Sequence, residues 1–115
     1  MSIFTQIPER SRRDSLRPIA VLRSEPPELA QRFTLSFEPG RGRFADSDAA
    51  LVQLASGQQF MLVHHRDDPM GGTELLASES SPRPAEDLRA FLTAFEIAGR
   101  EVRWALAGGP RDRVV

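Results

Sequence analysis

The sequence of 115 residues contains no cysteine, and it also lacks lysine, asparagine and tyrosine. Without cysteine, disulfide bonds, zinc–thiolate sites and cysteine nucleophiles are excluded. This absence is compatible with a reducing compartment, and we expect a cytoplasmic protein. No apolar run approaches the roughly 20 residues of a membrane-spanning helix, and the N-terminus lacks the apolar region of a signal peptide. We therefore expect no membrane contact.

All 15 basic residues are arginines, and 16 acidic residues bring the formal net charge to -1. The three amino acids that are missing besides cysteine are encoded by AT-rich codons, which indicates a GC-rich, bacterial genome. The arginine content therefore reflects the genome as well as any function. A pI of about 6.1 is not typical of a dedicated nucleic-acid-binding protein.

The chain is organised around residues 50–65, where two apolar runs flank Ser56 and Gly57. This pattern predicts two β-strands joined by a tight turn. If Gly57 takes the left-handed conformation of a three-residue loop, Val52 lies opposite Phe60 and one face of the hairpin is apolar throughout. We predict that this face forms the core, and it carries Ala50, Val52, Leu54, Phe60 and Leu62.

The opposite face of the hairpin is apolar but is interrupted by the amides Gln53 and Gln59. A single helix covers only one face of a sheet, so the N-terminal segment or another subunit must bury this second face. We expect a protein partner or self-association, such as a homodimer, at this surface. The predicted binding residues are Leu51, Met61, Val63, His65, Arg12 and Arg13.

Three more strands are predicted before and after the hairpin. Ile19–Arg23 is an apolar run that two prolines follow, and Arg32–Phe37 alternates between apolar and polar residues, as a strand does when it is packed on one side. Residues 73–78 follow a glycine turn and predict a meander strand with Leu75 inward.

A helix is predicted over about residues 85–98, because leucine and phenylalanine recur there at the spacing of one helical stripe. Pro84 suits the first helical position, and Gly99 is expected to end the helix as a left-handed cap. The last predicted strand alternates directly afterwards, with three apolar residues inward, which are Val102, Trp104 and Leu106.

These elements together predict an α+β fold. We expect an antiparallel sheet of five to six strands, built as a meander around the hairpin at 50–65, with one main helix at about 85–98 packed on one face. Residues 1–18 are expected to form a partly ordered N-terminal arm. Residues 19–106 form the single domain, and residues 107–115 form a flexible tail.

Histidines and aspartates are expected to meet at the open end of the hairpin. Antiparallel pairing places the start of one strand beside the end of the other. Imidazole and carboxylate groups can bind a divalent metal or act as general base and acid. Neighbouring histidines in a strand point to opposite faces, however, which places His64 on the core face and His65 on the other face. The catalytic candidates are His64, His65, Asp46, Asp48, Asp67 and Asp68.

No motif of a known enzyme or nucleic-acid-binding family is present. We therefore favour a small bacterial binding or accessory protein, non-catalytic, that acts through protein–protein contacts of its sheet face. One alternative is an enzyme or a small-ligand or metal-binding protein that uses the histidine–aspartate cluster. We expect no cofactor and no bound metal. The second alternative is weak nucleic-acid binding through Arg10, Arg12, Arg13, Arg17, Arg41 and Arg43.

Overall fold

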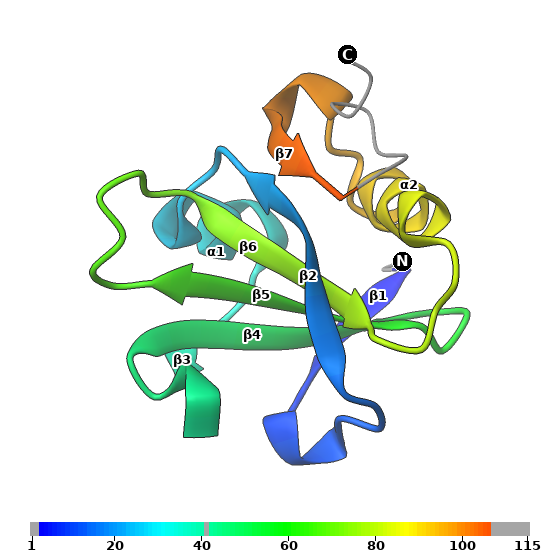
Figure 1. The fold of residues 1–115 in the computed structure, drawn as a ribbon, viewed down its shortest axis with the longest axis horizontal. Coiled ribbons are helices and arrows are strands. Elements are labelled where there is room, and N and C mark those ends of the chain that lie inside the picture. The colour runs from blue at the N-terminus through cyan, green and yellow to red at the C-terminus, as the bar shows by residue number, and fades with distance from the viewer. Residues whose placement is uncertain (1–2, 41, 107–115) are drawn as a thin grey trace.

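The computed structural model describes residues 3–40 and 42–106, apart from the side chain of Arg43. Seven antiparallel strands form one sheet in the order β1-β4-β5-β6-β2-β7, with the short β3 paired to β4 (Figure 1). The elements in chain order are β1 (Phe4–Ile7), the 3-10 helix η1 (Glu9–Ser11), β2 (Leu16–Leu22), α1 (Pro26–Phe33), β3 (Glu38–Pro39), the 3-10 helix η2 (Gly42–Phe44), β4 (Ser47–Leu54), β5 (Gln59–His65), β6 (Thr73–Ser78), α2 (Pro84–Phe95), the 3-10 helix η3 (Gly99–Glu101) and β7 (Val102–Ala105).

The α+β class, the antiparallel sheet and the single main helix are confirmed. The predicted hairpin register is also confirmed, because Val52 lies opposite Phe60 and Ala50 lies opposite Leu62. Gly57 has a φ of +95° in the turn, as the three-residue loop requires. The alternation of side chains along a strand then sends the predicted apolar set to one face of the sheet.

Helix α2 covers this face and completes the main core. Its apolar stripe packs on the hairpin and on β2, with the rings of Phe60 and Phe91 5.3 Å apart. Phe91 stacks on Phe95 at 4.3 Å, and Phe95 stacks on Phe4 of strand β1 at 3.9 Å. The aromatic contacts therefore connect the centre of the sheet to its β1 edge.

The prediction of a strand over Arg32–Phe37 is wrong, because helix α1 occupies Pro26–Phe33. Prolines at its first two positions preset the helical backbone dihedral. Thr34 then takes a left-handed conformation with a φ of 56°, and the N–H of Leu35 donates to Ala30 O at 3.1 Å. The alternating side chains still turn toward the core, because the chain leaves the helix through this left-handed residue.

The predicted end of the main helix at Gly99 is also wrong. Helix α2 ends at Phe95, and Glu96 is the left-handed residue, with a φ of 54°. The N–H of Ile97 donates to Leu92 O at 2.9 Å, which is the hydrogen bond of a Schellman motif. Ile97 is buried in the main core, so its packing offsets the cost of a non-glycine left-handed residue.

The inward position predicted for Trp104 is wrong because strand β7 is irregular. The register with β2 shifts between Val21, which lies opposite Trp104, and Leu22, which lies opposite Val102. A bulge of this kind breaks the strict alternation of side chains. Val102 and Ala105 are therefore buried, whereas Trp104 is 46 % exposed.

The N-terminal segment belongs to the sheet. Strand β1 pairs with the edge of β4, and the predicted boundary between residues 18 and 19 falls inside strand β2. The predicted tail at 107–115 lies outside the described residues. Within the described part of the chain, no helix has the length and apolar character needed to cross a membrane.

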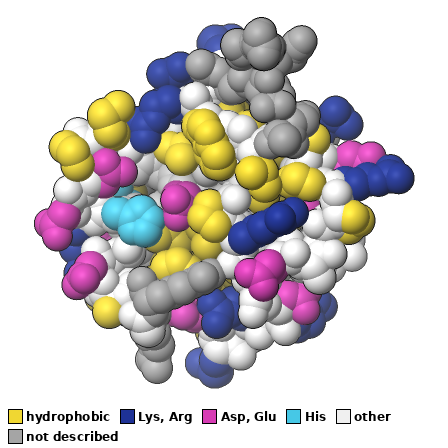
Figure 2. All heavy atoms as spheres, in the orientation of Figure 1, with side chains coloured by type: hydrophobic (Ala, Val, Ile, Leu, Met, Phe, Trp, Pro, Cys, Tyr) yellow, Lys and Arg dark blue, Asp and Glu magenta, His cyan; other side chains and the backbone are white. Residues whose placement is uncertain are grey.

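We predicted that the N-terminal segment or another subunit buries the second sheet face, and its apolar hairpin residues are buried within the chain itself. These residues form a second hydrophobic cluster, with exposed fractions of 2 % for Leu51 and 0 % for Met61 and Val63. Leu16 of β2 and Phe44 of η2 complete the cluster. Figure 2 shows that other hydrophobic side chains remain at the surface near the centre of this view, with charged side chains among and around them.

Candidate functional site

The end of the hairpin away from its turn carries the predicted histidine and aspartate residues. Asp48 lies opposite His64, and Ser47 lies opposite His65. The backbone therefore brings these residues to one end of the sheet, as predicted. Their side chains nevertheless form separate contacts. Among the described residues, no group of three or more histidine, aspartate or glutamate side chains is arranged to hold a metal ion.

Asp48 forms an ion pair with Arg66, which directly follows the hairpin. Arg66 Nη2 donates to Oδ1 of Asp48 at 2.9 Å, and Nε donates to the same oxygen at 3.3 Å. Nη2 also donates to the carbonyl oxygen of Ser47 at 3.1 Å. The hydrogen bond from Arg66 lowers the pKa of Asp48 below its ordinary value. Asp48 is therefore a charged ion-pair partner and a poor general base.

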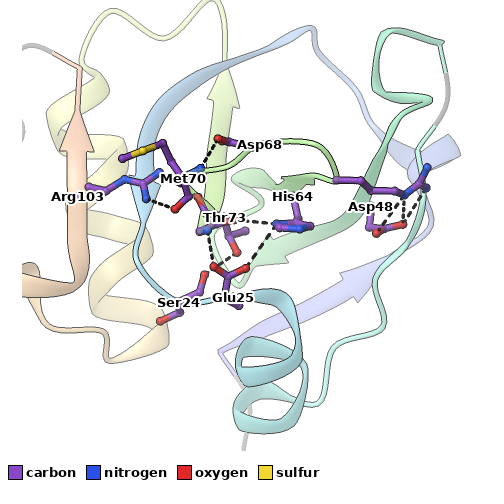
Figure 3. A network of polar contacts seen from close by, with 11 residues as sticks. Ser24, Glu25, Asp48, His64, Asp68, Met70, Thr73 and Arg103 are labelled. Carbon is purple, nitrogen blue, oxygen red and sulfur yellow. Dashed lines mark hydrogen bonds and ion pairs between the residues drawn. The ribbon is translucent and has the colours of Figure 1, made fainter.

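His64 lies on the core face of its strand, as predicted, and its ring points toward Glu25 at the start of helix α1 (Figure 3). Its Nδ1 lies 3.0 Å from Gly72 O and 3.8 Å from Glu25 Oε1. The N–H of Gly72 donates to Glu25 Oε2 at 2.7 Å. Gly72 is therefore held through both of its backbone polar groups, by a carboxylate and an imidazole.

Further hydrogen bonds fasten the loop between β5 and β6 to its surroundings (Figure 3). Thr73 Oγ1 donates to Ser24 O at 2.7 Å, and the guanidinium of Arg103 donates to Met70 O at 2.9 Å and to Gly71 O at 3.0 Å. The acceptors are all backbone carbonyl oxygens, in the loop or just before helix α1, that would otherwise lack a hydrogen-bond donor. The contacts of His64 Nδ1 therefore help to position a loop.

The remaining aspartates of the predicted cluster do not join it. Asp68 Oδ1 accepts the N–H of Met70 at 2.8 Å, which is an Asx turn within the loop. Asp46 and Asp67 are exposed, and their side chains form no hydrogen bond or ion pair with any described residue. Within the predicted six-residue site, Asp48 thus forms an ion pair, His64 contacts a loop and Asp68 forms a turn, each separately from the others.

His65 lies on the second sheet face, as predicted, and connects two residues that sequence reasoning missed. Its Nδ1 lies 2.9 Å from Ser47 Oγ, and its Nε2 lies 3.1 Å from Glu74 Oε1. A hydroxyl, an imidazole and a carboxylate in this order can activate a serine as a nucleophile. Ser47 is only 2 % exposed, however, so a substrate does not reach its hydroxyl. Ser47, His65 and Glu74 therefore form a row of hydrogen-bonded polar side chains across strands β4, β5 and β6, which we call the His65 row.

The sheet edge along β4 is shared by two short strands with a gap between them. Ile7 at the end of β1 lies opposite Leu51, and Glu38 at the start of β3 lies opposite Ala49. Among the described residues, the position opposite Ala50 on this edge is empty. The chain leaves the sheet on one side of this gap and enters it on the other.

An open groove of about 1190 Å³ lies at this gap. One wall is the segment from Gln6 to Arg12, and the other wall is formed by Ser36 and residues 38–40. Arg10 and Arg12 are exposed on the first wall, and their side chains have no hydrogen-bond or ion-pair partner among the described residues. The apolar floor that a ligand can reach consists of Ile7 and Ala49, which are half-buried and pack against the second hydrophobic cluster, whereas the lining residues Leu51 and Met61 are almost fully buried.

A buried glutamine fixes the first wall of the groove to the sheet. Gln59 is 8 % exposed, and its Nε2 donates to Ser11 O at 3.1 Å. Its Oε1 accepts the N–H of Arg13 at 3.0 Å. Gln53 Oε1 accepts a second hydrogen bond from the same Nε2 at 3.1 Å. The backbone on both sides of Arg12 is therefore held in place before any ligand binds.

The arginines predicted to contact nucleic acid do not act as one set. The guanidinium of Arg13 donates to Gly57 O, and that of Arg17 donates to Ser81 O at 3.1 Å. Arg41 and the side chain of Arg43 lie outside the described residues. Only the first two arginines of the predicted set, Arg10 and Arg12, therefore have side chains that are both described and unpaired.

Comparisons of the chain with protein-family models, curated proteins and solved structures give no match. The function therefore has to be argued from the site. The serine and glutamate of the His65 row were accessible to sequence reasoning in part, because the predicted register already places Ser47 opposite His65. The groove carries no local sequence signal, since residues far apart in the chain form its two walls.

Proposed function

We propose that this protein is a non-catalytic binding module that holds an extended segment of a partner protein in the groove between η1 and β3. The observation that carries the proposal is the pairing of an apolar floor with a wall that Gln59 fixes in advance. A preorganised site binds more tightly, because less conformational entropy is lost on binding.

The shape and charge of the groove support a polypeptide as the ligand. The groove is larger than most pockets that enclose a small molecule, for which about 300–1,000 Å³ is usual. The side chain of Gln6 on one wall bridges to the other wall through two hydrogen bonds with the backbone of Ser36. Both walls are charged, since Glu9, Arg10 and Arg12 lie on one wall and Glu38 lies on the other. An extended segment presents apolar and polar side chains alternately, which matches an apolar floor between charged walls.

Selection of peptides displayed on phage tests the proposal. We expect peptides to be enriched on the full chain and to be lost on the Ala49→Phe variant, because Ala49 is half-buried at the floor and a phenyl ring there fills the groove. Thr93→Phe is the matched control, since Thr93 is exposed on α2, which covers the other sheet face. Thermal unfolding verifies that both variants fold.

Two outcomes would overturn the proposal. The first is the absence of any enriched peptide, and the second is enrichment that is equal on the wild type and on a folded Ala49→Phe variant. Bacterial origin, a cytoplasmic location and self-association remain predictions. A catalytic function has less support, because Ser47 is buried and Nδ1 of His64 contacts the loop between β5 and β6.

A further inference from the structure

A second, smaller pocket of about 280 Å³ lies near the start of helix α2, away from the groove. The turn of the central hairpin, the loop after β6 and the segment that precedes β2 form its walls. Asp87, in the first turn of α2, lines this pocket together with Gln58. Its charged lining residues are Arg13, Asp14 and Asp87.

Asp87 has an unsatisfied carboxylate oxygen. The residue is 8 % exposed, and its Oδ1 accepts the side-chain N–H of Gln58 at 2.9 Å. Its Oδ2 is buried without a hydrogen-bond partner among the described residues. A buried carboxylate oxygen is costly to leave unpaired, and in native structures such an atom calls for a donor.

The charged lining of the pocket comprises two carboxylates, Asp87 and Asp14, and one guanidinium, Arg13. The guanidinium of Arg13 already donates to Gly57 O, and Asp14 adds a second carboxylate, which accepts the hydroxyl of Ser78 at 3.3 Å. Ser80 and Ser81 provide further oxygen atoms on the loop after β6. Carboxylates, hydroxyls and a fixed amide are acceptors that match the N–H groups of an ammonium ion.

We propose that this pocket binds a small molecule with a primary ammonium group, which donates to the carboxylate of Asp87. The volume of about 280 Å³ restricts the ligand to a small amine, below the size of ligands in typical drug-binding pockets. The site is independent of the groove, so its occupation does not require the proposed peptide-binding function.

Titration of the full chain by two-dimensional ¹H–¹⁵N NMR tests this site with propylammonium chloride as the probe. We expect saturable shifts at the side-chain amide of Gln58 and at the backbone amides of Ser80 and Ser81. Neutral 1-propanol and sodium chloride serve as controls for size and ionic strength. We expect Asp87→Asn to weaken binding at least about tenfold, because an amide nitrogen replaces a charged acceptor.

Two further variants make the test specific. Glu86→Gln removes a neighbouring exposed carboxylate, which pairs with Arg83 outside the pocket, and we expect it to leave the affinity unchanged. Ser80→Leu narrows the pocket without altering Asp87, and we expect it to abolish binding. The proposal is overturned if no saturable shift appears at about 10 mM probe, where a millimolar site fills, or if Asp87→Asn binds as the wild type does.

Discussion

Replacement of Gln59 by alanine is expected to loosen residues 11–13, whose backbone the Gln59 side chain holds to the sheet. The side chain forms three hydrogen bonds, to Ser11, Arg13 and Gln53. Each contributes about 1 kcal/mol net, and burial of the side chain adds a similar amount. Ser11 and Arg13 are exposed and recover part of this loss by bonding to water. We therefore expect the free energy of unfolding to fall by about 2–4 kcal/mol.

The loss is measurable both globally and locally. For a chain of this size, 1 kcal/mol corresponds to about 4 °C in melting temperature, so we expect a decrease of about 8–16 °C. Amide hydrogen exchange reports on the local effect, since the N–H of Arg13 loses its acceptor. Gln31→Ala is the matched control, because Gln31 is exposed on α1.

Unchanged stability and unchanged hydrogen exchange in the Gln59→Ala variant would refute the role of Gln59. If Gln59→Ala unfolds within about 0.5 kcal/mol of the wild type and Arg13 exchanges at an unchanged rate, Gln59 does not hold the wall of the groove. A destabilised variant that still binds the selected peptides with full affinity would separate the two roles. Gln59 would then stabilise the fold, but preorganisation would not contribute to binding.

Two other predictions concern the turns and the ion pair. Gly57→Ala places a Cβ at a φ of +95° with no atom within 4 Å, so denaturant unfolding should show that the free energy of unfolding falls by about 1–2 kcal/mol. Gly72→Ala places a Cβ 2.6 Å from Leu22 O, so the free energy of unfolding should fall by more than about 2 kcal/mol. Equal losses in the two variants would contradict this prediction. Asp48→Asn removes a carboxyl whose pKa is lowered by Arg66 from its ordinary 3.8, so its contribution is present above that value and is lost as the pH falls through the folded-state pKa. The stability difference from the wild type should therefore shrink in acid, and a difference that does not change with pH would contradict the ion pair.

The central hairpin was predictable because its information is local. Gly57 sets the loop, and the loop sets the register, which in turn decides which side chains face the core. The same register correctly separates His64 from His65. Residues 73–78 were predictable for a similar reason, since a glycine turn and a short apolar run define a meander strand without distant contacts.

Helix ends and the groove were not predictable, because they depend on tertiary contacts. Thr34 and Glu96 adopt the left-handed conformation that glycine usually provides, and neither residue type signals it. The next residue in each case, Leu35 or Ile97, is buried in the main core, and this packing is absent from any local pattern. The alternation of Arg32–Phe37 therefore indicated the buried side chains correctly but the secondary structure wrongly.

The two amides on the second sheet face explain why the proposed binding surface lies at an edge. An amide on a buried sheet face is costly unless it is hydrogen-bonded, and Gln59 bonds to the backbone of a segment that is not a strand. Gln53 accepts a further hydrogen bond from Gln59, so both polar atoms of the Gln59 side chain have partners. The chain itself therefore covers the face near these amides. The covering segment stops short of β3, so the apolar floor between the two is where a partner can reach the second cluster.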